Sequence, residues 1–169
     1  MQAELLILRL IHVVGGILWV GSAFMSFFFL MPAIAQAGPA GGQVMLNLQK
    51  RKLFTVLPVV AILTMLSGLR LMQIVSGGFD GAYFRTGPGR MFSIAGGIAI
   101  VAFLIGITIS RPAAMKMAKM QQAAASDETT RSKIQAEVKA LQRRAGLSGI
   151  IVTWMLALAA VGMAIARYM

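Results

Sequence analysis

The side chains with the clearest capacity for chemistry lie in the first two apolar stretches of the chain. His12 is the single histidine, and Arg9 precedes it by three residues, so the two share one side of a helix. Met65 and Arg70 fall in the second stretch. At 1.5 Å per helical residue, His12 and Met65 lie roughly 12 Å and 15 Å below the same membrane surface. Imidazole and thioether groups both ligate haem iron, so this pair could hold a haem whose propionates bind Arg9 and Arg70.

A structural interpretation of the same residues stands beside this hypothesis. A buried histidine can simply bond to a neighbouring helix, methionine is a common flexible filler of cores, and arginine stems carry their guanidinium groups to lipid phosphates. The nearest acids, Glu4 and Asp80, are too few to neutralise the basic cluster. This surplus of positive charge predicts an anionic group near the outer surface: phospholipid, a quinone-type head group or haem propionates.

The sequence lacks the residues for most other chemistries. With one histidine and no cysteine, a bis-histidine haem within one chain, an ordinary zinc site and thiol catalysis are excluded. No serine has an available histidine and carboxylate, and no apolar stretch contains a carboxylate pair or an acidic relay. Met115, Met117 and Met120 could suit copper(I), but Lys116 and Lys119 beside them would repel a cation. We therefore predict no catalytic residues.

The composition identifies the elements that must position these residues. Of 169 residues, 58% are hydrophobic and 12% are charged, and the mean hydropathy is +0.79. A soluble domain carries about 25% charged residues, so the chain belongs to the membrane class. Crossing about 30 Å of hydrocarbon takes roughly 20 helical residues. We predict an all-α transmembrane four-helix bundle, a single membrane domain over residues 1–169, with spans at 5–35, 53–76, 91–110 and 147–166.

Lysine and arginine are distributed unequally between the two sides of this predicted bundle. Eleven lie in the connections around 50–52 and 111–146, and three lie in the connection 77–90 and at the C-terminus. Positive charge marks the cytoplasmic side, so both termini should face outward. The net charge of +11 is then explained by topology and anionic phospholipid, and nucleic acid is not an expected partner.

Residues 111–146 are too polar to be embedded but are strong helix formers. We predict that the third and fourth spans continue here as a cytoplasmic helical hairpin, with Ser126-Asp127-Glu128 capping the second arm. The hairpin could dock a partner or could be a long connection. Its apolar spacing resembles a heptad, with Ala113, Met117, Met120 and Ala124 on one arm and Ile134, Val138, Leu141 and Ala145 on the other.

Small residues on the spans predict close helix packing, because membrane helices associate through such surfaces. The first span has Gly15 and Gly16 on the side of His12. The third has Gly96, Gly97, Ala99, Ala102 and Gly106, and the fourth has Gly149, Thr153, Ala157, Ala160 and Ala164.

Three segments resemble a known group of small helical membrane proteins: residues 10–21 around His12, residues 51–68, and Thr86-Gly87-Pro88-Gly89. The group is the CopD-like and HemJ-like superfamily, which includes copper-resistance proteins, protoporphyrinogen oxidases and the membrane domain of cytochrome-linked urate oxidases. The resemblance implies haem on His12, with a methionine as a possible second ligand. The third span lacks the embedded lysine of the oxidases.

Two functions are therefore expected. The first is a non-catalytic accessory or structural subunit of the bacterial inner membrane, packed against a larger electron-transfer or photosynthetic complex or against further copies of itself. The alternative is a haem b-binding redox protein related to HemJ-type protoporphyrinogen oxidase, with His12 and Met65 on the iron and Arg9 and Arg70 on the propionates.

Overall fold

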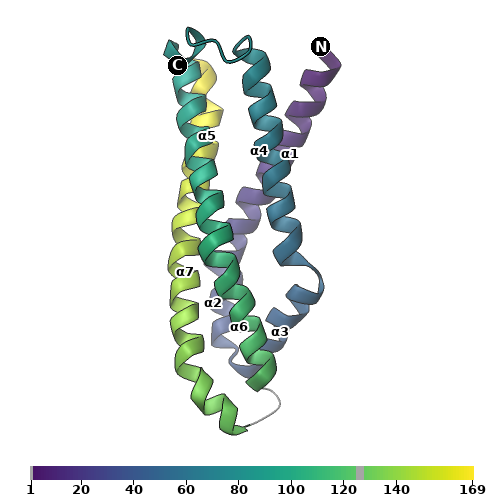
Figure 1. Ribbon diagram of the computed structural model, residues 1–169, viewed down its shortest axis with the longest axis vertical. Coiled ribbons are helices and arrows are strands. Elements are labelled where there is room, and N and C mark those ends of the chain that lie inside the picture. The colour runs from purple at the N-terminus through teal and green to yellow at the C-terminus, as the bar shows by residue number, and fades with distance from the viewer. Residues whose placement is uncertain (1, 125–127) are drawn as a thin grey trace.

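The computed structural model describes residues 2–124 and 128–169, and these residues form helices and short connections without a strand (Figure 1). Two segments, η1 (Ser26–Leu30) and η3 (Gly106–Ser110), are π-helical, and two others, η2 (Tyr83–Arg85) and η4 (Ala166–Tyr168), are single 3₁₀ turns. The elements in chain order are α1 (Gln2–Met25), η1 (Ser26–Leu30), α2 (Met31–Gln36), α3 (Pro39–Lys50), α4 (Leu53–Val75), η2 (Tyr83–Arg85), α5 (Gly87–Ile105), η3 (Gly106–Ser110), α6 (Arg111–Ala124), α7 (Glu128–Ile165) and η4 (Ala166–Tyr168).

Four helical stretches are long and apolar enough to cross a membrane, as the sequence predicts: Gln2–Gln36, Leu53–Val75, Gly87–Met117 and Glu137–Tyr168. Both chain ends lie at the same end of the molecule (Figure 1). The third stretch begins at Gly87 and not at residue 91, because Thr86 accepts a hydrogen bond from the amide of Gly89 and Pro88 suits the first helical turn. Which end faces outward stays a prediction.

The connection between the first two spans contains a helix that the sequence did not predict. Gly38, at φ 56°, turns the chain after α2, and α3 then folds back beside it, with Gly41 against the backbone of Ile34. A left-handed Lys52, at φ 59°, turns the chain again into α4. In this position the side chain of Met45 on α3 is buried, with an exposed fraction of 3%.

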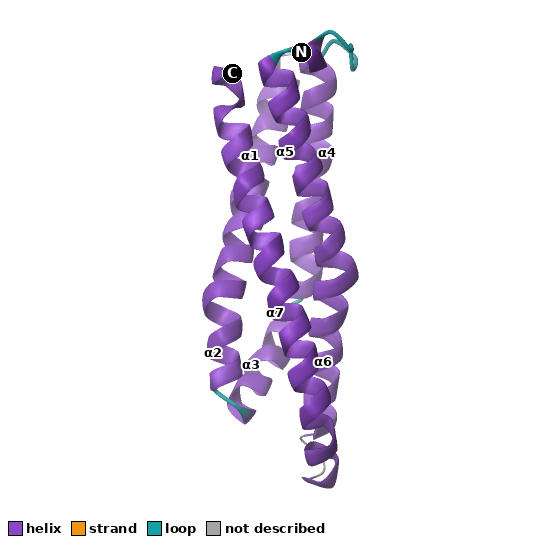
Figure 2. Cartoon of the chain, turned by 90° about the vertical axis from the view of Figure 1, so that its left-hand side faces the viewer, coloured by secondary structure: helices purple, strands orange, loops and turns teal. Residues whose placement is uncertain are grey.

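The bundle is built from two helix pairs, α1 with α4 and α5 with α7 (Figures 1 and 2). Alanines along α5 let α7 approach closely, and Ala23 of α1 joins the two pairs. The buried core comprises Ala23, Ala99, Ala102, Val152, Leu156 and Ala159.

The predicted small residues contribute unequally to this packing. Gly149 of α7 faces η1, where a Cβ would overlap the ring of Phe27. By contrast, a Cβ on Gly96 or Gly97 would meet nothing within 4 Å. These two glycines therefore lie on the outer surface of α5, while Ala95 faces α7.

At the end of the molecule away from the chain ends, α6 and the first part of α7 lie side by side and extend further than α2 and α3 (Figures 1 and 2). Ala113, Met117 and Ala145 are buried together, with Leu141 packed against them, as the heptad spacing predicts. Lys116 also pairs with Glu137 across the two helices at 2.5 Å. The predicted cap at Ser126 and Asp127 falls outside the described residues, and α7 begins at Glu128.

Replacement of Gly149 by alanine should destabilise the protein by about 1–3 kcal/mol, because the new methyl group displaces the ring of Phe27. The matched control is Gly146→Ala on the same helix, where a Cβ meets nothing within 4 Å. That change should be neutral or slightly stabilising, since alanine is the better helix former. Unfolding in mixed micelles, followed by circular dichroism, measures both. Equal stabilities of the two variants would contradict the packing of η1 on α7.

Candidate functional site

His12 lies at the contact between α1 and α4. Its Nδ1 is 2.8 Å from the backbone oxygen of Thr64. Because a carbonyl oxygen can only accept, Nδ1 is the donor, and in the neutral ring Nε2 carries the lone pair. The ring also lies against Gly68, where a Cβ would be 2.6 Å from Cε1. The absence of a side chain at Gly68 is thus what lets the imidazole approach α4.

Arg70 forms an ion pair with Glu4, one of the two acids that were expected to be too few to neutralise the basic cluster. Its Nε and Nη2 donate to Oε1 of Glu4 at 3.0 and 2.6 Å, and its Nη1 donates to Gln73 at 3.0 Å. Arg9 is exposed on α1. The pair Glu4–Arg70 and the contact His12–Thr64 both join α1 to α4, so these residues hold together the half of this helix pair that is nearer the chain ends.

The predicted haem residues are brought together only in part. Met65 follows Thr64 by one residue, which turns it about 100° around α4 from the residue that His12 contacts. The guanidinium of Arg70 is engaged with Glu4 and Gln73. His12 itself fits axial ligation, because a histidine ligand usually donates its other N–H to a carbonyl. The residues around His12 therefore supply one oriented ligand.

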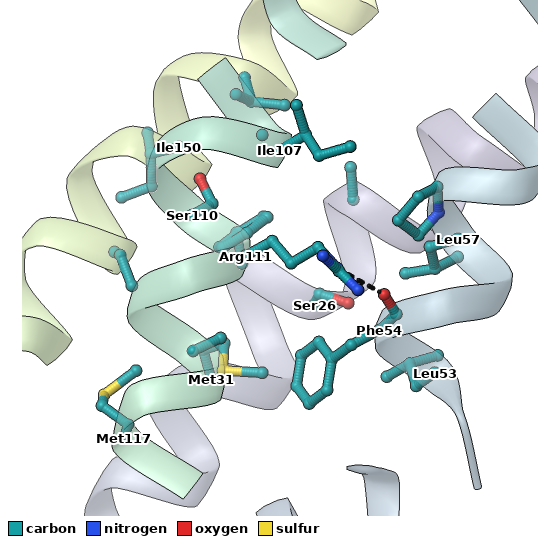
Figure 3. A pocket seen from close by; sticks show the side chains of 18 of the residues that line it. Ser26, Met31, Leu53, Phe54, Leu57, Ile107, Ser110, Arg111, Met117 and Ile150 are labelled. Atoms are coloured by element: carbon teal, nitrogen blue, oxygen red, sulfur yellow. Dashed lines mark hydrogen bonds between the residues drawn. The ribbon is translucent and has the colours of Figure 1, made fainter. Parts of the chain in front are cut away.

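A cavity of about 360 Å³ lies in the other half of the molecule, at the end where α3 and α6 are found (Figure 3). Its volume is within the range of about 300–1,000 Å³ that is usual for ligand sites. All four spans and α3 contribute to its wall, which is almost wholly apolar and does not include His12. This cavity was not expected from the sequence.

Three of the four spanning stretches depart from regular α-helix around this cavity. The π-helical segments Ser26–Leu30 and Gly106–Ser110 both contribute to its wall, and so does Pro58, which lies inside α4. π-helical turns are rare and are found frequently at functional sites. Their coincidence at one level marks the cavity as the most specialised part of the bundle.

Arg111 provides the charged group of the cavity, and its position follows from Pro58. Proline has no N–H, so the carbonyl of Phe54, four residues earlier, loses its helical donor. Nε of Arg111 donates to this oxygen at 3.0 Å. Figure 3 shows the guanidinium reaching from η3 and α6 across the cavity to α4. Among the described residues, Nη1 and Nη2 of Arg111 make no hydrogen bond.

The hydroxyl groups on the opposite wall are already satisfied. Oγ of Ser110 and Oγ of Ser148 are 2.9 Å apart and buried. Ser148 donates to the backbone oxygen of Arg144 at 2.9 Å, so Ser110 is the donor in the serine pair. This bond joins η3 to α7, and Arg111 is the charged residue among those that line the cavity.

The fold and these contacts define a multi-pass helical membrane protein. In one half α1 and α4 are joined by side-chain hydrogen bonds, and the other half contains the cavity. Comparison with the models of known families, with curated proteins and with solved structures gives no match to this chain. The resemblance to the CopD-like and HemJ-like superfamily therefore stays a prediction.

Arg111→Met should cost about 1–3 kcal/mol of stability, because it leaves the carbonyl of Phe54 without a donor inside the membrane. Pro58→Ala supplies the missing N–H, so the same arginine change should cost less in that background. A double-mutant cycle of unfolding in mixed micelles measures this coupling, expected at about 1 kcal/mol.

The control for this cycle is Arg143→Met, which removes an equal charge from an exposed position on α7. Arg143 should show no coupling to residue 58. Additive costs for Arg111 and Pro58 would mean that the two residues do not share the oxygen of Phe54.

Proposed function

We propose that this protein is a non-catalytic accessory subunit of a larger assembly in the bacterial cytoplasmic membrane. The observation that carries the proposal is the helical pair formed by α6 and the first part of α7. Helix α6 follows α5 and η3 without a break, and the first part of α7 belongs to the same helix as the fourth span. An electron-transfer or photosynthetic complex is the expected host.

The length of α7 indicates a projection from the bilayer. Its 38 residues extend over about 57 Å, whereas the hydrocarbon core is about 30 Å thick. The pair is held by its own apolar contacts and by the ion pair between Lys116 and Glu137. Because the same helices form the bundle, a partner bound to the projection would be fixed in position relative to the membrane domain.

The surface of the projection is basic. Lys119 on α6 and Lys139, Arg143 and Arg144 on α7 are exposed. Such a surface complements an acidic partner and, by the distribution of positive charge, faces the cytoplasm. Gly96 and Gly97 on the outer face of α5 add a small-residue surface of the kind at which membrane helices meet.

Reversal of charge on the projection tests the accessory role. The double change Lys119→Glu with Lys139→Glu should reduce the share of chain found in a high-mass assembly about tenfold in native gels of mildly solubilised membranes. The fold should persist, because both side chains are exposed. The matched control is Arg85→Glu with Arg90→Glu, an equal charge change at the opposite end of the molecule. A chain that migrates alone in the wild type, or an equal loss in both double variants, would contradict the proposal.

A second candidate, haem binding at His12, is supported by the bond from Nδ1 to Thr64, which presents Nε2 as a lone pair. Haem would supply one-electron redox chemistry when bound. The chain's part would be to hold the imidazole in one tautomer and orientation through Thr64 and Gly68. Met65 as second ligand and Arg9 with Arg70 on the propionates stay predictions, and Arg70 would first have to leave Glu4.

Absorption spectra test this candidate. Protein produced with excess haem should show a Soret band, and His12→Gln should abolish it while keeping an amide donor for the carbonyl of Thr64. Met65→Leu should keep the band but shift it, because one axial ligand changes. Colourless wild-type protein, or an unchanged band in His12→Gln, would exclude haem on His12.

A further inference from the structure

We infer that the inner cavity binds one anionic phospholipid, with its phosphate on Arg111 and an acyl chain inside the cavity. The inference goes beyond the accessory role, because it involves this chain's own residues and no partner subunit. Its experiment gives an answer whether or not a larger assembly exists.

The first argument is the unbalanced charge of Arg111. Nε is bonded to the oxygen of Phe54, while Nη1 and Nη2 make no hydrogen bond among the described residues. The side chain is half-buried against an almost wholly apolar wall. A charge in such surroundings is costly unless an opposite charge meets it. Guanidinium binds phosphate through two parallel N–H donors, so a phosphate is the matching group.

The second argument is the depth of the guanidinium. Arg111 follows Gly87, the first residue of α5, by 24 residues along a continuous helix, or about 36 Å. The hydrocarbon core is about 30 Å thick and the polar region begins just beyond it. Arg111 therefore lies at the level of lipid phosphates on that side. Part of the cavity lies between Arg111 and the middle of the bilayer, and Ala114 and Met117 line the part beyond it.

The third argument is the shape and lining of the cavity. Its wall includes Ala61 from the second span and Ala102, Phe103 and Ile107 from the third. The side chain of Ser26 points into the same space as the guanidinium (Figure 3). One charged group in the wall of an otherwise apolar cavity of about 360 Å³ matches an amphiphile with one anionic head and a hydrocarbon chain.

The surrounding surface selects the sign of the head group. Lys50 at the end of α3 and Arg51 and Lys52 in the turn before α4 are exposed, and they directly precede the cavity residues Leu53 and Phe54. Arg143 and Arg144 are exposed on α7, next to the cavity residues Ala145 and Gly146. This basic rim favours lipids with net negative charge, each basic side chain contributing about 1 kcal/mol near an anionic surface. A zwitterionic lipid or an uncharged quinone head would gain much less from the rim.

The test uses the full chain in bilayer discs that contain equal amounts of dioleoyl phosphatidylglycerol and dioleoyl phosphatidylcholine. After transfer to detergent, native mass spectrometry should find one phosphatidylglycerol retained per chain. Arg111→Gln should weaken this retention about tenfold, because it removes the charge but leaves an amide that can donate to Phe54. Arg143→Gln removes the same charge from the rim and should weaken retention about twofold.

A second variant tests occupancy of the cavity without any change of charge. Gly106 lies in the wall, and a Cβ there meets nothing within 4 Å, so Gly106→Leu can fill the space without disturbing the helix contacts. It should abolish the retained lipid while circular dichroism and unfolding stay unchanged. The inference is overturned if the wild type retains no lipid, if phosphatidylcholine is retained equally, if Arg111→Gln and Arg143→Gln act alike, or if Gly106→Leu leaves retention intact.

Discussion

Every part of this structure depends on the rule that a backbone polar group in hydrocarbon must be bonded within the protein. Regular helix satisfies the rule along most of the four spans. Pro58 breaks it at one place by removing the N–H that the carbonyl of Phe54 requires, and Nε of Arg111 restores it from another span. A helix defect in α4 thus fixes the position of a charged side chain on the third span, and that side chain connects the two helix pairs.

The two halves of the bundle differ in how closely their helices pack. In the half that carries both termini, α1 and α4 are close enough for the backbone of Thr64 to accept a bond from His12, and Arg70 pairs with Glu4. In the other half, the π-helical segments and Pro58 contribute to the wall of the cavity. The cavity therefore lies where three of the spanning stretches depart from regular α-helix, and the close contact of α1 with α4 lies where both helices are regular.

Sequence reasoning found the spans, because length and hydropathy alone determine them, and it found the apolar contact between α6 and the first part of α7. It could not pair helices. Glu4 and Arg70 were both noted, but the rotation of α1 and α4 that brings these two side chains together could not be read from the sequence. Gly96 and Gly97 were assigned to packing, yet the rotation of α5 turns them outward. Arg111 was counted as a topological charge, although Pro58 four residues after Phe54 was a signal that a carbonyl needed an external donor.

The contrast between Arg70 and Arg111 indicates where a ligand is needed. The guanidinium of Arg70 uses Nε, Nη1 and Nη2 on groups of this chain, and a carboxylate balances its charge, so nothing further is required to explain its place. Among the described residues Arg111 has one neutral carbonyl as its hydrogen-bond partner, and it faces an almost wholly apolar wall. Among the described residues Arg111 pairs with no carboxylate, and we infer that an anionic lipid of the membrane supplies the counter-charge. The folded protein and a bound anionic lipid are, on this argument, a single stable unit.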